Sequence, residues 1–364
     1  MKISQIITEL EDYAPLFLQE GFDNSGLQVG DISQEVRGIL LCLDVTEEVV
    51  EEAIKLGCNL IISHHPLLFK PLKKLTGKTY IERCVIKACK HDIVIYASHT
   101  NMDNAFGGVN YHLAEKIGLQ NVQVLSPKKD CLLKLVTFVP ESQAEKVRNA
   151  LFEMGAGQIG KYDSCSFNAS GSGTFRAGED AHPYVGNLNE LHTEPEIRIE
   201  TIIPVYKKSA VLRALLAVHP YEEPAYDFYS LENDWMQVGS GIVGELSYPE
   251  DEESFLRKLK TIFNLKTLKH SPLTGKQIRK VALCGGSGAF LIPDAISCGA
   301  DIFITGEAKY NDYYDVENRI LLAVIGHYES EVATKEIFYN IITKKITNFV
   351  IHFSTVDTNP VNFM

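Results

Sequence analysis

The sequence predicts an α/β fold in which a duplicated α/β domain is interrupted by a smaller α+β insert. The first and last thirds of the chain alternate apolar strands with helices, a rhythm typical of sheets with parallel strands. The middle third has a different order of elements. We therefore expect a first half-domain at 1–129, an insert at 130–234 and a second half-domain at 235–364.

The alternation in the first third begins with the apolar strand RGILLCLDV (37–45). The helix TEEVVEEAIKLG (46–57) follows, with a threonine suited to cap its first turn and a glycine suited to end it. Strand CNLIIS (58–63), helix TYIERCVIKACKHD (79–92) and strand IVIYAS (93–98) come next. Because such sheets bind ligands beyond the carboxyl ends of their strands, we expect a site there.

The last third repeats this pattern. LCLDVTEEVVEEAIKLGCNLIISHH (41–65) aligns without a gap with LCGGSGAFLIPDAISCGADIFITGE (283–307), and the alignment matches Gly57 with Gly299. The identities are few, so two interpretations remain: chance similarity of two strand–helix–strand units, and an internal duplication. The duplication explains the constant offset between the two segments.

The next strand of each half ends in the same polar pattern. His99 precedes Asp103 by four residues after IVIYAS, and His327 precedes Glu331 by four residues after ILLAVIG. Solubility or packing does not explain a histidine–carboxylate pair that recurs at matching places, so the pattern indicates a functional role.

Two adjacent histidines, His64 and His65, directly follow the strand CNLIIS. Successive side chains of an extended strand point to opposite faces, so these two imidazoles cannot easily bind a single ion. They could each bind one of two neighbouring ions, with Pro66 fixing the exit of the strand. The competing interpretation is that both histidines are capping residues.

Five side chains therefore form a candidate site for two divalent metal ions per chain. Imidazole and carboxylate ligands suit zinc, which we expect first, and also iron or manganese. Five residues are few for two ions, so one carboxylate should bridge them and water should fill the open positions. The candidate ligands are His64, His65, Asp103, His327 and Glu331.

The motifs SHHP, SHTNMD, GHYESE, FDNSGLQVG and TGE together resemble the Nif-three-like family. The resemblance spans both ends of the chain, although Phe22 stands where members often have tryptophan. It implies a homohexamer with a dinuclear metal centre and an activity like that of a GTP cyclohydrolase. It also implies that this chain is a bacterial long form, which carries an insert similar to signalling proteins of the PII and CutA kind.

Carried over to this sequence, the resemblance implies the same five ligands, with Glu331 as the bridge. We expect His65 and Asp103 to bind one ion, and His64 and His327 to bind the other.

Other residues are expected beside the ions. The family pattern does not include His99 as a ligand, so we expect it to donate a hydrogen bond or transfer a proton, which makes it a candidate catalytic residue together with Glu331. Asp44 and Glu307 follow strands and could face the site, and the resemblance adds Asn24. The glycine-rich CGGSGAF could be a tight turn or an anion cradle, but it lacks the residues of a P-loop.

The middle third predicts a ferredoxin-like α+β insert from its order strand, helix, loop, strand, helix, strand. The corresponding segments are 132–140, 141–157, a Gly/Ser-rich loop at 166–186, 196–204, 207–220 and 221–231. The insert could sense a small ligand or cover the entrance to a central cavity. Its histidines His182, His192 and His219 have no recurrent partner spacing, so we expect structural or surface roles.

Composition excludes some classes of protein. The net charge of −12 and the absence of a basic run argue against a nucleic-acid partner. No uncharged apolar stretch approaches the roughly 20 residues of a membrane span. The eight cysteines are scattered without a C-x-x-C pair, which predicts reduced thiols in a cytoplasmic protein.

Two functions remain open from the sequence. The first is a metal-dependent hydrolase that acts on a nucleotide or another phosphorylated small molecule, because two neighbouring ions stabilise charge on phosphate oxygens. The alternative is a non-enzymatic metal-binding or regulatory hexameric assembly.

Overall fold

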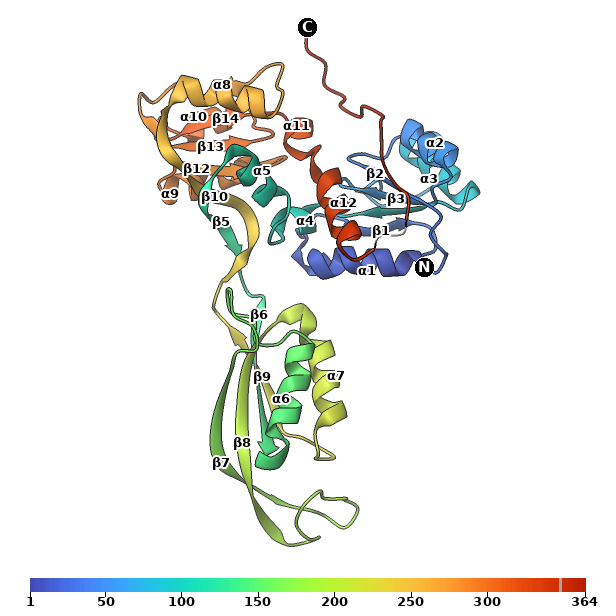
Figure 1. The fold of residues 1–364 in the computed structure, drawn as a ribbon, viewed down its shortest axis with the longest axis vertical. Coiled ribbons are helices and arrows are strands. Elements are labelled where there is room, and N and C mark those ends of the chain that lie inside the picture. The colour runs from blue at the N-terminus through green and yellow to red at the C-terminus, as the bar shows by residue number, and fades with distance from the viewer. Residues whose placement is uncertain (347–348) are drawn as a thin grey trace. The chain divides into compact units, whose positions relative to one another are not determined.

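The computed structural model describes residues 1–346 and 349–364 as a mixed α/β protein with three sheets (Figure 1). The chain forms two compact units. Unit 1 comprises Met1–Pro127 and Gln237–Met364, and unit 2 comprises Lys128–Met236. Unit 1 contains two of the sheets and unit 2 the third.

The first sheet of unit 1 has the strand order β1-β4-β3-β2-β15. Its centre consists of the parallel strands β2 (Ile39–Cys42), β3 (Leu60–Ser63) and β4 (Val94–Ala97), in which every residue is buried. The strand β15 (Ile351–Phe353) lies parallel beside β2, and β1 (Gly26–Val29) pairs antiparallel with β4.

Helices α2 (Glu47–Leu56) and α3 (Tyr80–Lys90) pack together against this sheet in one apolar cluster. The hydroxyl of Thr46 accepts a hydrogen bond from the backbone N–H of Val49, and Gly57 ends α2 with a φ of 71°. Thr46 and Gly57 thus cap and end α2 as the sequence predicts. Helices α1 (Ile3–Tyr13) and α12 (Thr334–Lys345) contact each other, and α12 also contacts β2.

The second sheet of unit 1 repeats this parallel centre. Strands β12, β13 and β14 are parallel, and β10 and β11 join them in antiparallel fashion. In sheet order the strands are β11 (Lys269–His270), β14 (Leu321–Val324), β13 (Ile302–Thr305), β12 (Gln277–Cys284), β10 (Trp235–Asp251) and β5 (Gln120–Lys128).

Helices cover both faces of the second sheet. Helices α5 (Val109–Ile117) and α8 (Glu252–Ile262) share one apolar cluster with it, and α9 (Ile292–Ser297) shares another. The short helices α4 (Thr100–Asn104) and α11 (His327–Glu331) follow β4 and β14 directly. Both predicted histidine–carboxylate pairs therefore lie just beyond strand ends.

The remaining short helices connect larger elements. They are α10 (Asp312–Asp315) and the 3-10 turns η1 (Leu16–Leu18), η2 (Glu141–Gln143), η3 (Val205–Lys207) and η4 (Gly288–Leu291). In the described residues, no helix combines the length and the apolarity that crossing a bilayer requires.

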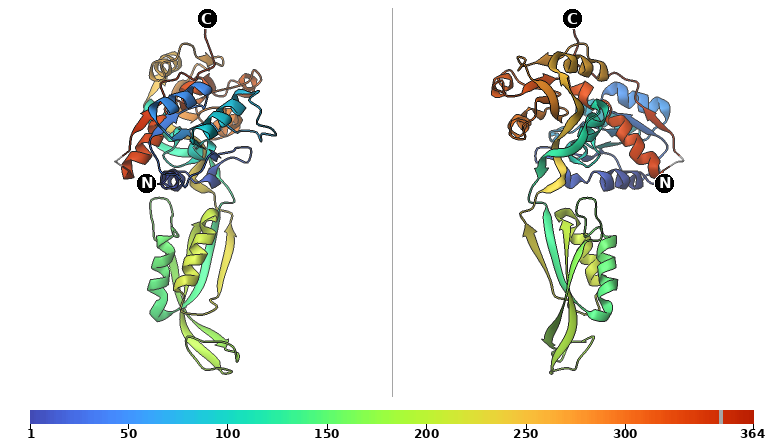
Figure 2. Two further views of the ribbon diagram at one scale, coloured as in Figure 1. Left: turned by 90° about the vertical axis from the view of Figure 1, so that its right-hand side faces the viewer. Right: turned by 60° about the vertical axis from the view of Figure 1, so that its left-hand side comes forward.

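Unit 2 has one antiparallel sheet in the order β7-β8-β6-β9. Its helices α6 and α7 lie side by side on one face of the sheet (Figure 2) and share an apolar cluster with β6 and β8. Along the chain the elements are β6 (Leu132–Pro140), α6 (Ala144–Glu153), β7 (Ser166–Arg176), β8 (Leu191–Pro204), α7 (Lys208–Val218) and β9 (Tyr226–Leu231).

The Gly/Ser-rich stretch expected as a loop at 166–186 is in part a strand. Residues 166–176 form β7 and pair with β8 from Ser166↔Thr201 to Arg176↔Leu191. Glycine and serine are rare in strands because they offer little side chain to pack. The hydrogen bonds between strands are made by backbone groups, however, and the long partner strand β8 supplies these groups here.

Unit 1 should fold without unit 2. We predict that replacing Lys128–Met236 by a short Gly/Ser linker leaves a soluble protein, because β5 and β10 are neighbours in one sheet and the linker closes only a short loop. Far-UV circular dichroism and a cooperative thermal transition would show this. A control deletion that starts at Leu113, a core residue of α5, should aggregate. Aggregation of the first deletion with several linkers would contradict the prediction.

Candidate metal centre

The five predicted ligands converge at the strand ends of unit 1. His64 and His65 follow β3, Asp103 lies in α4, and α11 begins at His327 and ends at Glu331. A spacing of four residues places two side chains on one helical face. Accordingly, His327 Nε2 lies 3.0 Å from Glu331 Oε2.

His64 is completely buried and oriented by the backbone. Its Nδ1 lies 3.0 Å from the carbonyl oxygen of Ser98, so Nδ1 carries the proton and Nε2 presents a lone pair. That Nε2 lies 3.6 Å from Asp103 Oδ1 and 3.8 Å from Glu331 Oε1. Burial lowers the pKa of His64 to about 4, so the ring is neutral at pH 7.

Two buried atoms in this group have no hydrogen-bond partner among the described residues: His64 Nε2 and Asp103 Oδ1. The two atoms face each other, and both are acceptors when Asp103 is ionised. A buried polar atom without a partner is costly, and a cation between the two would satisfy both. The donor set therefore fits a metal ion.

His65 is held by carboxylates at both ring nitrogens. Its Nδ1 lies 2.7 Å from Asp44 Oδ1, and its Nε2 lies 2.9 Å from Glu331 Oε2. Burial alone lowers the pKa of His65, but the two carboxylates raise it to about 10. His65 Nε2 also lies 3.2 Å from His327 Nε2. The proton on His65 Nε2 thus lies among three potential ligand atoms, which are this nitrogen, Glu331 Oε2 and His327 Nε2.

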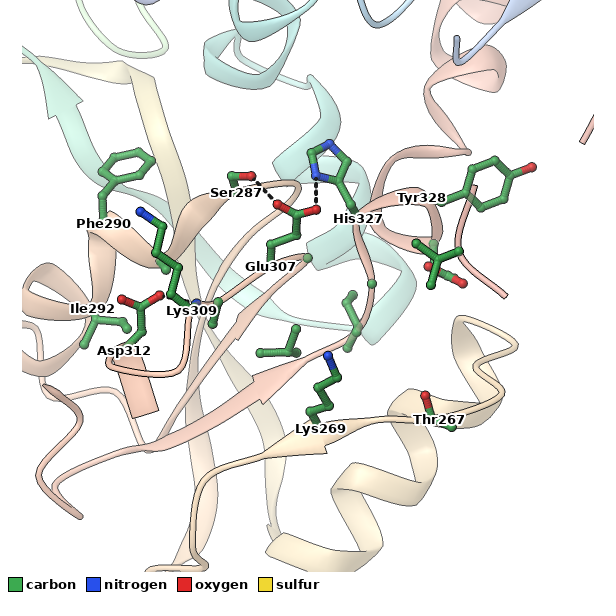
Figure 3. A pocket seen from close by; sticks show the side chains of 18 of the residues that line it. Thr267, Lys269, Ser287, Phe290, Ile292, Glu307, Lys309, Asp312, His327 and Tyr328 are labelled. Atoms are coloured by element: carbon green, nitrogen blue, oxygen red, sulfur yellow. Dashed lines mark hydrogen bonds and ion pairs between the residues drawn. The ribbon is translucent and has the colours of Figure 1, made fainter. Parts of the chain in front are cut away.

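His327 is oriented in the same way. Its Nδ1 lies 3.2 Å from Glu307 Oε1, and Glu307 Oε2 accepts a hydrogen bond of 2.8 Å from Ser287 Oγ (Figure 3). Burial opposes the charge on His327, but Glu331 raises its pKa. Asp44 and Glu307 thus each hold the second nitrogen of a candidate ligand, as metal-binding histidines require.

The pKa values of the two buried carboxylates, Glu331 and Asp103, are shifted in opposite directions. Burial would raise the pKa of Glu331, yet its hydrogen bonds with His327 and His65 and the nearby ring of His64 hold it well below its usual range. Burial and the charge of Glu331 raise the pKa of Asp103 well above its usual range. Two carboxylates in one buried region repel each other, and a cation would relieve this repulsion.

Two groups of side chains that share Glu331 could each hold a metal ion: His64, Asp103 and Glu331, and His65, His327 and Glu331. Within each group the ligand atoms lie within 4.8 Å of one another. The predicted division, with His65 beside Asp103 and His64 beside His327, differs from this grouping. The reason is orientation: the Ser98 carbonyl turns His64 toward α4, and Asp44 turns His65 toward α11.

His99 lies beside both adjacent histidines and forms a third such group with them. Its ring centre is 5.2 Å from that of His64 and 5.4 Å from that of His65. Its Nδ1 lies 2.7 Å from Oδ1 of Asp23, a side chain that is completely buried. Burial would raise the pKa of Asp23, but the hydrogen bond and charge of His99 lower it. Asp23 thus fixes the orientation of the His99 ring.

Sequence reasoning missed Asp23 and named its neighbour Asn24 instead. The side chain of Asn24 donates a hydrogen bond of 2.6 Å to the carbonyl of Leu68, so it fixes a loop rather than the cluster. Asp23 lies 76 residues from His99, so no local spacing connects the two. The motif FDNSGLQVG was the only signal.

The CGGSGAF segment is a tight turn, because side chains already bind its backbone N–H groups. Gly285 donates to Asn110 Oδ1 at 2.9 Å, Gly286 to Ser330 Oγ at 3.0 Å and Gly288 to Thr305 Oγ1 at 3.0 Å. Gly286 has a φ of +57°, and a Cβ there would clash with Glu331 Oε1. The turn therefore positions the shared carboxylate.

A pocket of about 1200 Å³ opens beside the cluster. Asp44, His65 and His327 belong to its wall, so a ligand in the pocket would reach the candidate metal centre. Figure 3 shows Lys269 and Lys309 projecting from other parts of the wall.

Comparison with known proteins gives the family. The model of Duf34/NIF3 (NGG1p interacting factor 3) matches residues 1–360. The chain belongs to the DUF34/NIF3 family. It is 37% identical to a "GTP cyclohydrolase 1 type 2 homolog" from Halalkalibacterium halodurans, covering 100% of both chains.

Solved structures agree with this assignment to the DUF34/NIF3 family. A Bacillus cereus protein related to NIF3 matches with a TM-score of 0.88 and 39% identity, covering 100% of this chain and 99% of the other. A Staphylococcus aureus protein, SA1388, matches with a TM-score of 0.79 and 32% identity, with the same coverage.

Gly286 should be essential for the cluster. We predict that Gly286→Ala weakens metal binding about 10- to 100-fold, as loss of supporting contacts around metal ligands does, because the new Cβ displaces Glu331. Calorimetric zinc titration would measure this. Gly285→Ala is the matched control, since its Cβ would meet only ordinary contacts at 3.4–3.7 Å. Equal affinity of both variants would contradict the prediction.

Proposed function

We propose that this protein binds two divalent metal ions per chain and hydrolyses a nucleotide or another phosphorylated small molecule. One observation carries the proposal: His64 Nε2 and Asp103 Oδ1 are buried, face each other and have no partner among the described residues. The expected metal is zinc, with iron or manganese as alternatives, because the ligands are imidazoles and carboxylates.

The proposed ligands are His64 and Asp103 for one ion, His65 and His327 for the other, and Glu331 for both. The two oxygens of Glu331 support this assignment, since Oε1 faces His64 and Oε2 faces His65 and His327. When bound, the two ions would lower the pKa of a water molecule and stabilise charge on a phosphate oxygen.

The surrounding side chains have separate proposed roles. Asp44 and Glu307 keep the proton of His65 and His327 on Nδ1, so that each Nε2 is free to bind a metal. We propose that His99 is the general acid–base, because Asp23 fixes its Nδ1 and leaves Nε2 beside the cluster. Glu331 remains the second proposed catalytic residue.

Two lysines, and not the net charge of the pocket wall, support a phosphorylated substrate, because six acidic side chains among the described residues line the same pocket. Lys269 and Lys309 line it, and within the described part of the chain neither lysine has an acidic partner within 4.0 Å. An ammonium group without a partner is available to bind a phosphate oxygen. GTP cyclohydrolase activity, which the names of relatives mention, is one member of this substrate class.

The assembly and its history are also proposals. By family resemblance the protein is a homohexamer in the cytoplasm. The two parallel centres, β2-β3-β4 and β12-β13-β14, support an origin by duplication. The chain order of unit 2 and its sheet order β7-β8-β6-β9 support the predicted ferredoxin-like, PII/CutA-like insert.

Metal stoichiometry tests the dinuclear centre. We predict about two ions per chain in the loaded protein and a larger loss of bound metal in Glu331→Gln than in Asp103→Asn. Glu331 would neutralise both ions, which repel each other roughly four times as strongly as unit charges do, whereas Asp103 would serve one ion. Elemental analysis after gel filtration would measure this. Losses that are equal, or greater for Asp103→Asn, would refute the assignment of Glu331 as the bridge.

Turnover distinguishes an enzyme from a non-enzymatic metal-binding assembly. The metal-loaded protein should hydrolyse at least one member of a panel of nucleotides and phosphoesters, and Lys269→Ala should raise KM about tenfold for loss of one charged contact. Lys260→Ala is the control, because Lys260 is exposed on α8 and lies outside the pocket. Two bound ions with no turnover of any substrate would favour the metal-binding assembly.

A further inference from the structure

Unit 2 contains a second pocket, of about 770 Å³, which lies outside the candidate metal centre. It lies on the face of the sheet opposite α6 and α7. Ile197 and Ile199 of β8 pack with these helices, whereas the alternating residues Glu196 and Arg198 line the pocket. The other walls come from β7 and from residues 180–184 and 221–225.

Glu196 lies in the wall of this pocket and is only 8% exposed. Its Oε1 accepts a hydrogen bond of 2.7 Å from the hydroxyl of Tyr221. Across the described residues, no lysine, arginine or histidine lies within 4.0 Å of this carboxylate. A buried carboxylate without a cation beside it is unfavourable, so a positively charged group next to Glu196 would be stabilised.

The backbone of β7 makes room for this carboxylate. A Cβ at Gly173 would clash with both oxygens of Glu196, so the glycine permits the acid to lie against the strand. This explains why a Gly/Ser-rich sequence forms one wall of the pocket. Small side chains at Ser170, Gly171 and Ser172 leave the rest of that wall open.

Tyr221 is fixed in place by His219. The Nδ1 of His219 accepts a hydrogen bond of 3.1 Å from the backbone N–H of Tyr221, and its Nε2 donates one of 3.0 Å to the carbonyl of Phe138. Burial raises the pKa of Tyr221, and Glu196 raises it further, so the hydroxyl keeps its proton and donates it. His219 therefore has a structural role, as expected from the sequence.

Aromatic rings form much of the remaining wall. The ring of Tyr221 lies 5.9 Å from that of Phe175 and 6.3 Å from that of Tyr184, and Phe138 lies on β6. The faces of aromatic rings attract cations. The same wall therefore offers both apolar contact and a favourable electrostatic surface for a positively charged group.

The charges around the pocket are unbalanced. Asp180, Glu222 and Glu223 line it together with Glu196, whereas Arg198 is the one lysine or arginine among the described lining residues. Arg198 is already paired, since its Nη2 lies 2.9 Å from an oxygen of Glu200. The excess negative charge is available to an incoming cation.

We propose that this pocket binds a small organic cation of the alkylammonium or quaternary ammonium class, with its charge against Glu196 and its carbon atoms against the aromatic rings. The buried acid supplies the charge contact, and the rings of Phe175, Tyr184 and Tyr221 supply cation–π and apolar contacts. Such a site lies in unit 2 and does not depend on the proposed metal chemistry.

A matched pair of probes tests the charge requirement. Choline and its neutral isostere 3,3-dimethyl-1-butanol should be titrated into the full-length protein by calorimetry, with spermidine as a primary-amine probe. We expect at least one ammonium probe to bind, and the neutral isostere to bind at least tenfold more weakly than choline if choline is that probe. Binding of neither ammonium probe, or equal affinity for choline and its isostere, would overturn the proposal.

Variants test the residues. Glu196→Gln should weaken ammonium binding at least tenfold, whereas Glu145→Gln should not change it, because Glu145 lies exposed on α6 outside the pocket. Phe175→Leu keeps an apolar side chain but removes a ring face, and should also weaken binding. Unchanged affinity in Glu196→Gln would overturn the assignment.

Glu196 is buried, so its variant could fail to fold. The folding of each variant is therefore checked by thermal unfolding, and the wild-type protein supplies an independent measurement. Amide chemical shifts in NMR should change on ammonium binding at Gly171, Gly173 and Tyr221, which surround the carboxylate. Shift changes confined to other residues would place the cation elsewhere and refute the proposed site.

Discussion

The arrangement of unit 1 depends on one buried carboxylate. Glu331, only 3% exposed, lies among three imidazoles that come from the other sheet of the unit and from its own helix. A carboxylate at this depth is tolerated only because positive or polar partners surround it. Three separate features follow from this need: the adjacent histidines at the end of β3, the spacing of four residues in α11, and a glycine at 286 that leaves space for Oε1.

Much of the fold could be predicted because its signals are local. The strand–helix alternation, the cap at Thr46 and the stop at Gly57 depend on neighbouring residues, and all occur in the structure. β7 could not be predicted in this way. Its residues have low strand propensity, and its pairing with β8 depends on a partner that begins 15 residues after β7 ends.

In the candidate site, too, the features with local sequence signals could be predicted and those that depend on distant residues could not. The side chains that converge could be predicted from the sequence because they come after strands and because one spacing recurs; they are His64, His65, Asp103, His327 and Glu331. The grouping of these side chains in the structure differs from the predicted division, because the grouping depends on ring orientation. A carbonyl at Ser98 and a carboxylate at Asp44 select which nitrogen of each histidine faces inward, and neither is adjacent in sequence to the ring that it orients. Asp23 could not be predicted either, because it lies 76 residues from the His99 ring that it orients.

The ribosome synthesises the candidate ligands at widely separated times. His64, His65 and Asp103 are made early, whereas His327 and Glu331 lie in the last 38 residues of the 364-residue chain. At roughly 5–20 residues per second, the ribosome needs tens of seconds or less to translate the segment between Asp103 and His327. All of unit 2 is made in that interval. The early histidines must therefore remain without their partners on the nascent chain, and the complete cluster can form only near or after release.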